Sequence, residues 1–388
     1  MVLLGLGTTI GLGTTMMSSA AEPLADISFV VDAAFYAPDA PAPGLVFSDD
    51  DVTFAPRLSM FVDAPLGSRA TVRALARANK GFDPGSEPNV EVRFDEYFVE
   101  VHVLDASRLD VRVGKFRTAF GSWVRRHLAW ENPLITAPAL YEDVLPMTDQ
   151  AAPADPAAFV ARRNSQDKQP DWVPIVWGPS YATGAALSGA TDTLRLDVEV
   201  KNTAVSSRPE TWDALTDGFD TDPTVTGRLE WRPAPEWSFG SSASLGPYMQ
   251  DDAEPTLPDG DSVDDFDQTT FGLDAAYEHH RLQVFSELAL AEFEVPRVGD
   301  VEVLSGFVEA KYKVTPQLWA AGRWNQSWFD DAPGLDVPWD RDTRRLDLAL
   351  GFHHGEHVAT KLQWSVGDQA GRDTDGDHLL AAQVVAWF

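Results

Sequence analysis

Arginines recur at even spacing through several segments in the first third of the chain. Arg69, Arg73 and Arg77 lie four residues apart, and side chains at even separations in a β-strand project from the same face. The positions between them are mainly apolar, so a row of guanidinium groups would oppose an apolar face. Such a row attracts anions and orients dipolar solutes, which makes it a candidate site of solute passage. The six residues of this arginine ladder are Arg57, Arg69, Arg73, Arg77, Arg93 and Arg112.

The ladder is followed by the sequence GKFRTAFG, Gly114 to Gly121, and then by the longest connection of the chain, residues 117–180. The first half of this connection is rich in Trp, Leu and Tyr, unlike the other long connections. Such apolar density predicts that the segment packs against the rest of the protein. If the alternating segments close into a barrel, the barrel interior is the surface available to it.

Catalytic motifs are absent from the sequence, which contains no G-x-S-x-G, H-E-x-x-H or Walker pattern. The chain is therefore not predicted to be an enzyme, and no cofactor is predicted. His353, His354 and His357 fall at an expected tight turn, where polar residues are common, so a metal site is the less favoured interpretation there.

One long connection is strongly acidic and contains no Lys or Arg. A solvated surface explains it, and calcium binding is the functional alternative. The run DTDGD at Asp373–Asp377 also has oxygen ligands suited to calcium, but no twelve-residue loop with a bidentate Glu follows it. The acidic residues of the connection are Asp251, Asp252, Glu254, Asp259, Asp261, Asp264, Asp265 and Asp267.

From Asp26 onward, apolar and polar residues alternate with a period of two, which predicts β-strands. Leu346, Leu348 and Leu350, for example, alternate with Arg345 and Asp347. About 16 such segments occur, an even number within the range of bacterial single-chain barrels. Short turns are expected to alternate strictly with long connections along the chain, and residues 292–303 are expected to form one of the long connections. That regularity is typical of an up-and-down barrel.

The last eleven residues, HLLAAQVVAWF, form a strand with one wholly apolar face that ends on Phe388. An apolar face and two strand edges must be covered by something. A closed barrel in a bilayer satisfies both needs, because lipid covers the outside and the first strand pairs with the last. A soluble secreted β protein is the alternative for this strand.

Composition restricts the remaining possibilities. The 388 residues carry a formal charge of -30, which argues against a nucleic-acid partner, and no Cys is present. Beyond residue 25, no apolar run is long enough for a spanning helix, which needs about 20 residues. Residues 1–21 carry no charge and end in Ser19-Ala20-Ala21, so they are predicted to be a signal peptide, with 22–388 as a single β-barrel domain.

The strand number, the exported start, the terminal Phe and the pattern from Gly114 to Gly121 together resemble the outer-membrane porin superfamily, in particular its phosphate-selective branch. In that branch, a Gly-basic-Phe-x-x-x-Phe-Gly strand end leads into a loop that folds inward and narrows the pore. The resemblance extends over nearly the whole chain, but this sequence has more Arg than Lys, where a phosphate pore is expected to be lined by Lys. By resemblance, the pore residues are Lys115, Arg117, Arg125 and Arg126, facing Glu131, Glu142 and Asp143.

The sequence thus predicts an all-β, transmembrane, up-and-down antiparallel β-barrel of about 16 strands, with 117–180 as a pore-constricting loop. We expect a passive diffusion channel for small hydrophilic solutes or anions in the bacterial outer membrane. Lipid and lipopolysaccharide would surround it, and the resemblance implies a homotrimer. The alternative is a surface binding or adhesion barrel whose acidic loops contact calcium or partners.

Overall fold

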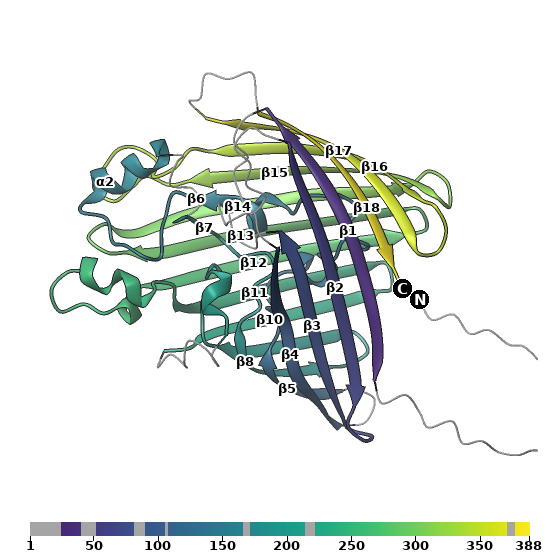
Figure 1. The fold of residues 1–388 in the computed structure, drawn as a ribbon. Helices are drawn as coiled ribbons and strands as arrows, with labels where there is room; N and C mark the ends of the chain where they lie inside the picture. Colours follow the sequence, from purple (N-terminus) through teal and green to yellow (C-terminus); the bar gives the residue numbers. More distant parts are fainter. Residues whose placement is uncertain are drawn as a thin grey trace, which may run out of the picture.

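Sixteen antiparallel strands close into one barrel in the computed structural model, which confirms the predicted fold class. The structure describes residues 25–39, 52–80, 90–104, 108–165, 171–213, 222–370 and 377–388. The predicted signal peptide and most of the run Asp373–Asp377 lie outside these ranges. Figure 1 shows the strands wrapping around the barrel, with both described chain ends on the same side. The barrel strands are β1 (Asp26–Pro38), β2 (Thr53–Pro65), β3 (Ala70–Lys80), β4 (Val90–Leu104), β5 (Leu109–Lys115), β8 (Thr183–Ala190), β9 (Leu194–Lys201), β10 (Thr224–Ala234), β11 (Trp237–Pro247), β12 (Asp267–His279), β13 (Leu282–Val295), β14 (Gly299–Lys313), β15 (Leu318–Phe329), β16 (Thr343–His353), β17 (Val358–Gln369) and β18 (Asp377–Trp387).

The two-residue period sorts side chains between the two faces of the barrel wall. On β16, Leu348 and Leu350 are exposed on the outside, while Asp347 and Ala349 are buried on the inside. The same division holds on β9, where Leu196 and the other outward residues are apolar and the inward residues are charged. The prediction that apolar residues face outward and charges face inward is therefore confirmed for these strands.

The barrel closes where β1 pairs with β18, so the last strand has partners on both edges. The pairing extends to the final residue, because the N–H of Phe388 donates to the carbonyl of Phe29 at 3.0 Å and the N–H of Phe29 donates to the carbonyl of Phe388 at 2.8 Å. The two Phe rings lie 6.0 Å apart. The end that carries the termini is called the turn end below, and the opposite end is called the loop end.

Short turns join the strands at the turn end and longer connections join them at the loop end, as predicted, with one exception. The connection expected at 292–303 is only three residues long, because β13 continues to Val295 and β14 begins at Gly299. The strands extend through this region because inward and outward side chains continue to alternate. Phe293 and Val301 face inward onto a buried apolar cluster, while Glu292 and Glu302 lie on the other face of the same strands.

The connection between β5 and β8 enters the barrel and fills part of it. It contains short helices and a two-stranded sheet whose edges pair Val144 with Pro174. Its apolar residues, including Trp123, Tyr141 and Phe159, share one core with inward residues of β13 and β14 at the loop end. The elements of this connection are η2 (Trp123–Arg126), α1 (Ala139–Glu142), β6 (Val144–Leu145), α2 (Pro156–Ala161), η3 (Arg162–Asn164) and β7 (Val173–Pro174).

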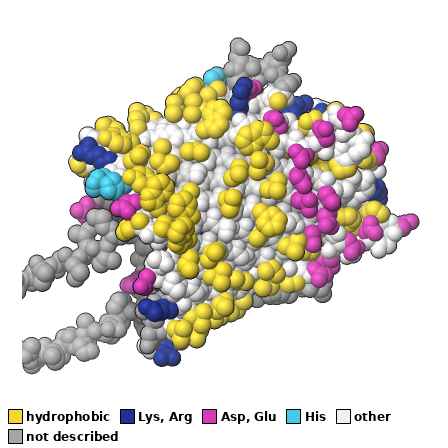
Figure 2. Space-filling model, turned by 180° about the vertical axis from the view of Figure 1, so that it is seen from behind, with side chains coloured by type: hydrophobic (Ala, Val, Ile, Leu, Met, Phe, Trp, Pro, Cys, Tyr) yellow, Lys and Arg dark blue, Asp and Glu magenta, His cyan; other side chains and the backbone are white. Residues whose placement is uncertain are grey.

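The outer surface carries an apolar belt. Figure 2 shows hydrophobic side chains spread over the wall and a band of acidic side chains at the loop end. Near the turn end, Trp231, Trp237, Phe239 and Tyr277 form a chain of ring contacts on the outside. Aromatic residues at this level are typical of a membrane interface. Within the described residues, no helix has the length and apolar content needed to cross a membrane.

Candidate functional site

Strands β2 to β5 carry five of the six ladder arginines. Arg57 lies on β2, Arg73 and Arg77 on β3, Arg93 on β4 and Arg112 on β5. The structure places Arg69 differently from the prediction: β3 begins at the next residue, so this side chain lies exposed in the turn. Alternation alone could not detect this, because a turn residue can continue the pattern of the strand that follows.

Each of the five arginines on the strands is paired with a carboxylate. Arg57 donates to Asp32 at 2.8 Å, and Arg112 donates to Glu100 at 3.1 Å. Glu100 also lies 3.4 Å from Arg73, which forms a second ion pair with Asp63 at 2.9 Å. Arg77 and Arg93 share Asp95, each at 2.9 Å. The sequence reasoning missed these acids. The signal that could have found them is a charged residue at the inward position of a neighbouring strand.

In most of these pairs the guanidinium is more exposed than the carboxylate. The Arg57 side chain is 34% exposed and Asp32 is 4% exposed, whereas Arg73 is 47% exposed and Glu100 is 9% exposed. Asp95 is fully buried beneath its two arginines. Asp63 is the exception in this group, because it is more exposed than its partner. The side of the ladder that meets water is therefore predominantly cationic.

The 117–180 connection, which we call the inner loop, is held to the wall by ion pairs in which it supplies the cation. Arg125 on η2 donates to Asp197 at 3.0 Å and also to Glu230. Arg126 donates to Glu309 at 2.5 Å and lies over the ring of Phe285. Below them lies a polar cavity of about 180 Å³ against β10 to β13. Two of the predicted pore residues therefore anchor the loop and also line an internal cavity.

The acids of the inner loop contact a different wall from the ladder. Asp143 accepts a hydrogen bond from Arg345 of β16 at 2.9 Å, and Glu142 lies 3.5 Å from the same guanidinium. These two carboxylates are therefore paired with Arg345 and not with the ladder, and a passage between the ladder and the loop carboxylates stays a prediction. Glu131, the third predicted acid, is exposed.

Lys115 and Arg117 lie where β5 passes into the inner loop. The Lys115 ammonium is buried and lies 3.8 Å from Asp213. The backbone N–H of Arg117 donates to Glu96 at 3.2 Å, and its side chain is partly exposed. Both residues thus lie beside the ladder at the entrance to the loop.

Two buried cations on the wall hold the inner loop and were not singled out from the sequence. Lys361 on β17 donates to the carbonyls of Ala129, Asn132 and Leu134, at distances between 2.5 and 3.2 Å. Arg323 on β15 donates to Ala137 at 2.7 Å, and it pairs with the buried carboxylates of the neighbouring strands. Both residues occupy inward positions in the two-residue period of their strands. This period predicts that they face the lumen but does not predict their partners.

Gly121 lies where the inner loop contacts the wall, and its N–H donates to the Ser242 hydroxyl at 3.1 Å. Its φ of +73° is in the left-handed region, and a Cβ there would meet the Tyr141 hydroxyl and the Glu287 carboxylate. These two groups are joined by a hydrogen bond of 2.5 Å. The tight turn and the contact therefore both require glycine.

Gly121→Ala is expected to lower the unfolding midpoint of the detergent-solubilised barrel. Left-handed strain costs about 1–3 kcal/mol, and displacement of the Tyr141 hydrogen bond adds to it. Gly260→Ala is the matched control, since Gly260 has a φ of +97° but no atom within 4 Å of its added Cβ. Equal losses in the two variants would show that only backbone strain matters at Gly121.

The carboxyl group of Glu142 is the titratable anchor of the inner loop. It accepts the N–H of Ala137 at 2.6 Å, and burial raises its pKa to about 7 although Arg345 favours the ionised form. Because the pKa in the folded state lies above the ordinary glutamate value of 4.5, the folded barrel retains a proton that the unfolded chain releases. The resulting stabilisation is complete at low pH and is lost as the pH rises to about 7.

Glu142→Gln is therefore expected to flatten the pH dependence of stability between pH 4.5 and 7. Wild-type protein should lose stability across this window, by about 3 kcal/mol if each pKa unit corresponds to about 1.4 kcal/mol. Urea unfolding at a series of pH values measures this. A wild-type curve that rises with pH, or a variant curve parallel to it, would contradict the assignment.

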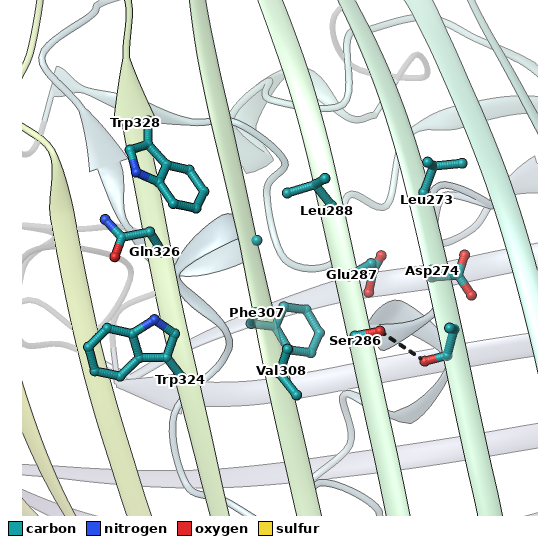
Figure 3. Close-up of a pocket in the computed structure, with 12 residues that line it drawn as sticks. Leu273, Asp274, Ser286, Glu287, Leu288, Phe307, Val308, Trp324, Gln326 and Trp328 are labelled. Atoms are coloured by element: carbon teal, nitrogen blue, oxygen red, sulfur yellow. Dashed lines mark hydrogen bonds between the residues drawn. The ribbon is translucent and has the colours of Figure 1, made fainter.

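A second cavity lies outside the barrel. It is a groove of about 410 Å³ on strands β12 to β15. Figure 3 shows the residues that line it, among them Leu273, Leu288, Val308, Trp324 and Trp328. Glu287 and Phe307 belong to the same strands, but their side chains are buried on the inner face of the wall. This groove therefore belongs to the apolar outer belt and not to the passage. Among the described residues, no group of three or more His, Asp or Glu is arranged to hold a metal ion.

Comparison with solved structures identifies similar barrels at low sequence identity. OprB of Pseudomonas putida matches with a TM-score of 0.59 and 13% identity, covering 94% of each chain. OmpT, an outer membrane protein of Vibrio cholerae, matches with a TM-score of 0.57 and 8% identity, covering 94% of this chain and 97% of its own. An anion-selective porin from Comamonas acidovorans matches with a TM-score of 0.55 and 12% identity, covering 94% and 99%. No family model and no curated protein matches the sequence. The chain therefore has the porin fold.

Proposed function

We propose that this protein is a passive diffusion channel for small hydrophilic solutes in the bacterial outer membrane. The observation that carries the proposal is an apolar belt around a closed barrel whose inner wall is charged and whose longest connection folds inside. An inner loop of this kind narrows the lumen and sets the size limit for solutes. The porin fold of the three similar structures supports the same conclusion.

Selection of solutes would follow from the chemistry of the wall. Charged groups on opposite sides of the narrowed lumen order water, so a solute must exchange hydrogen bonds with water for hydrogen bonds with the wall. Apolar solutes cannot make this exchange. The exposed guanidinium groups of Arg57 and Arg73 would be donors along one side. The five strand-borne ladder arginines, with Lys115, Arg117, Arg125 and Arg126, are the proposed pore-lining cations.

The finer resemblance to the phosphate-selective branch remains a proposal, as does the homotrimer that the resemblance implies. Phosphate added to a chloride-filled channel would block the chloride conductance if this branch applies. Molar-mass measurement in detergent by light scattering tests the trimer. A monomeric mass would remove the trimer and leave the channel proposal intact.

Planar-bilayer recording of the purified protein tests the channel function. We expect discrete conductance steps that grow with salt concentration and persist at low voltage. Protein that is shown to be closed, because it migrates faster in unheated than in heated denaturing gels, but that gives no conductance, would overturn the proposal.

A surface binding or adhesion barrel is the second candidate, and the acidic loop end favours it. Exposed carboxylates between β11 and β12, including Asp251, Asp252 and Asp259, would attract calcium or a cationic partner by their charge, without a preformed metal site among the described residues. Calorimetric titration with calcium separates the two functions. Calcium-dependent ligand binding by a non-conducting barrel would favour the adhesion protein.

A further inference from the structure

The loop end of the barrel has a large excess of acid. On the tip of β13 and β14, Glu292 is directly opposite Glu302 and Glu294 is directly opposite Asp300, so like charges face each other across the strand pair. Arg297, which lies at this tip, donates instead to the backbone carbonyls of Pro153 and Thr256. Figure 2 shows the resulting acidic band. Further exposed acids at this end are Asp251, Asp252, Glu254, Asp259, Asp261, Asp265, Asp330, Asp331 and Asp336.

Several ion pairs of the lumen turn their cation toward the water. Beyond the ladder, Arg195 is 40% exposed above Asp197, which is 9% exposed, and Arg232 is 63% exposed above Glu230, which is 5% exposed. Arg125 of the inner loop stands over the same two carboxylates. In these pairs the carboxylate lies against the wall and the guanidinium faces the water, as it does in most of the ladder. In other pairs the carboxylate is the more exposed partner, as for Asp63 beside Arg73, Asp143 beside Arg345 and Asp213 beside Lys115, and Arg228 is buried beneath both of its carboxylates.

A solute that enters from the loop end therefore meets two selectivity elements of opposite sign in series. We infer that the ion preference of this channel reverses with ionic strength, from cations at low salt to anions at high salt. This inference rests on the proposed channel function and specifies how that function discriminates between solutes.

The two elements respond differently to salt because they act over different distances. The acids of the loop end are exposed and act through the surrounding water, where the Debye length is about 30 Å at 0.01 M and about 3 Å at 1 M. The lumenal arginines act on ions within hydrogen-bond reach, and charge-assisted hydrogen bonds at contact are screened much less. At low salt the acidic field dominates and repels anions. At high salt it vanishes and the arginine contacts remain.

Reversal potentials of the wild-type channel under the same tenfold KCl gradient, measured once around 0.01 M and once around 1 M, test the inference. The potential is expected to change sign between the two conditions, with potassium more permeant at low salt and chloride more permeant at high salt. A conducting channel whose reversal potential has the same sign at both concentrations overturns this inference but leaves the proposed channel function intact. Absence of conductance at both overturns the proposed function and the inference with it.

Two variants separate the elements. D251N/D252N/D259N/D261N removes exposed acid while keeping Glu254 and Asp265, whose carboxylates accept hydrogen bonds within the loop. It should weaken the cation preference at low salt and leave the high-salt value unchanged. R73Q/R195Q should weaken the anion preference at high salt and leave the low-salt value unchanged.

The matched control is D192N/E356Q, which removes two acids from turns at the turn end. It should preserve the reversal of sign. A control that changes the low-salt preference as much as the fourfold variant would contradict the assignment to the loop end.

Discussion

Removal of the inner loop is expected to raise the single-channel conductance severalfold. The loop can be excised without moving the strands, because the N–H of Thr118 donates to the carbonyl of Ser180 at 2.7 Å and the two ends are already adjacent. Replacement of residues 119–179 by Asn-Gly would close β5 onto β8 with a two-residue turn. Conductance rises because the narrowed section then widens to the cross-section of the barrel.

The excised barrel is also expected to be less stable, since Phe293, Val301 and their apolar neighbours lose their covering at the loop end. Heat-dependent gel migration verifies that it remains closed. Deletion of residues 251–265, which lie between β11 and β12, is the control and should leave conductance in 1 M salt nearly unchanged. A closed barrel without the inner loop that conducts like wild type would show that the loop is not the constriction.

Arg323→Ala is expected to cause the largest loss of stability among single substitutions in the wall. The Arg323 side chain is fully buried, and it lies 3.3 Å from Glu309 and 2.9 Å from Asp347, which are buried as well. Its loss leaves buried carboxylates undercompensated and frees the loop carbonyl of Ala137. Removal of one partner from a buried network costs about 3–5 kcal/mol. Chemical unfolding in detergent measures this cost.

Arg344→Ala is the matched control on the adjacent strand. Arg344 pairs with Asp368, but its side chain is 60% exposed, and pairs of this kind contribute about 0–1 kcal/mol. The Arg323 variant should also show larger current fluctuations, because the loop segment near Ala137 has lost a donor. Similar stability losses in the two variants would contradict the role given to Arg323.

The fold could be predicted from the sequence because a single physical rule governs the whole chain. In a bilayer, a wall strand must place apolar residues outside, so Leu348 and Leu350 report the orientation of β16 without any knowledge of its neighbours. The rule does not apply at 292–303, because there the acids Glu292 and Glu302 lie on the outer face while Phe293 and Val301 face inward. The strands project beyond the apolar belt, where outward acids such as Glu294 are compatible with a continuing strand.

The candidate site was less accessible to prediction because it depends on partners distant in sequence. Arg345 and Asp143 are 202 residues apart, and Arg126 and Glu309 are 183 residues apart. Alternation assigns each residue to the lumen but gives no information about which strand faces which part of the loop. The ladder arginines could be recognised because Arg69, Arg73 and Arg77 repeat along one segment. Their acids were missed because Asp32 and Asp95 do not belong to such a repeat.

The central claim is that the arginine-faced interior is the conducting path. The sequence contains no Cys, so Arg73→Cys introduces a unique thiol on the inner face, and Leu348→Cys introduces one on the outer face. Single-channel conductance is measured before and after a charged methanethiosulfonate reagent is added. The account predicts a stepwise change that a reductant reverses at residue 73 and no change at residue 348. Unaltered conductance at residue 73, with modification verified by mass, would contradict it.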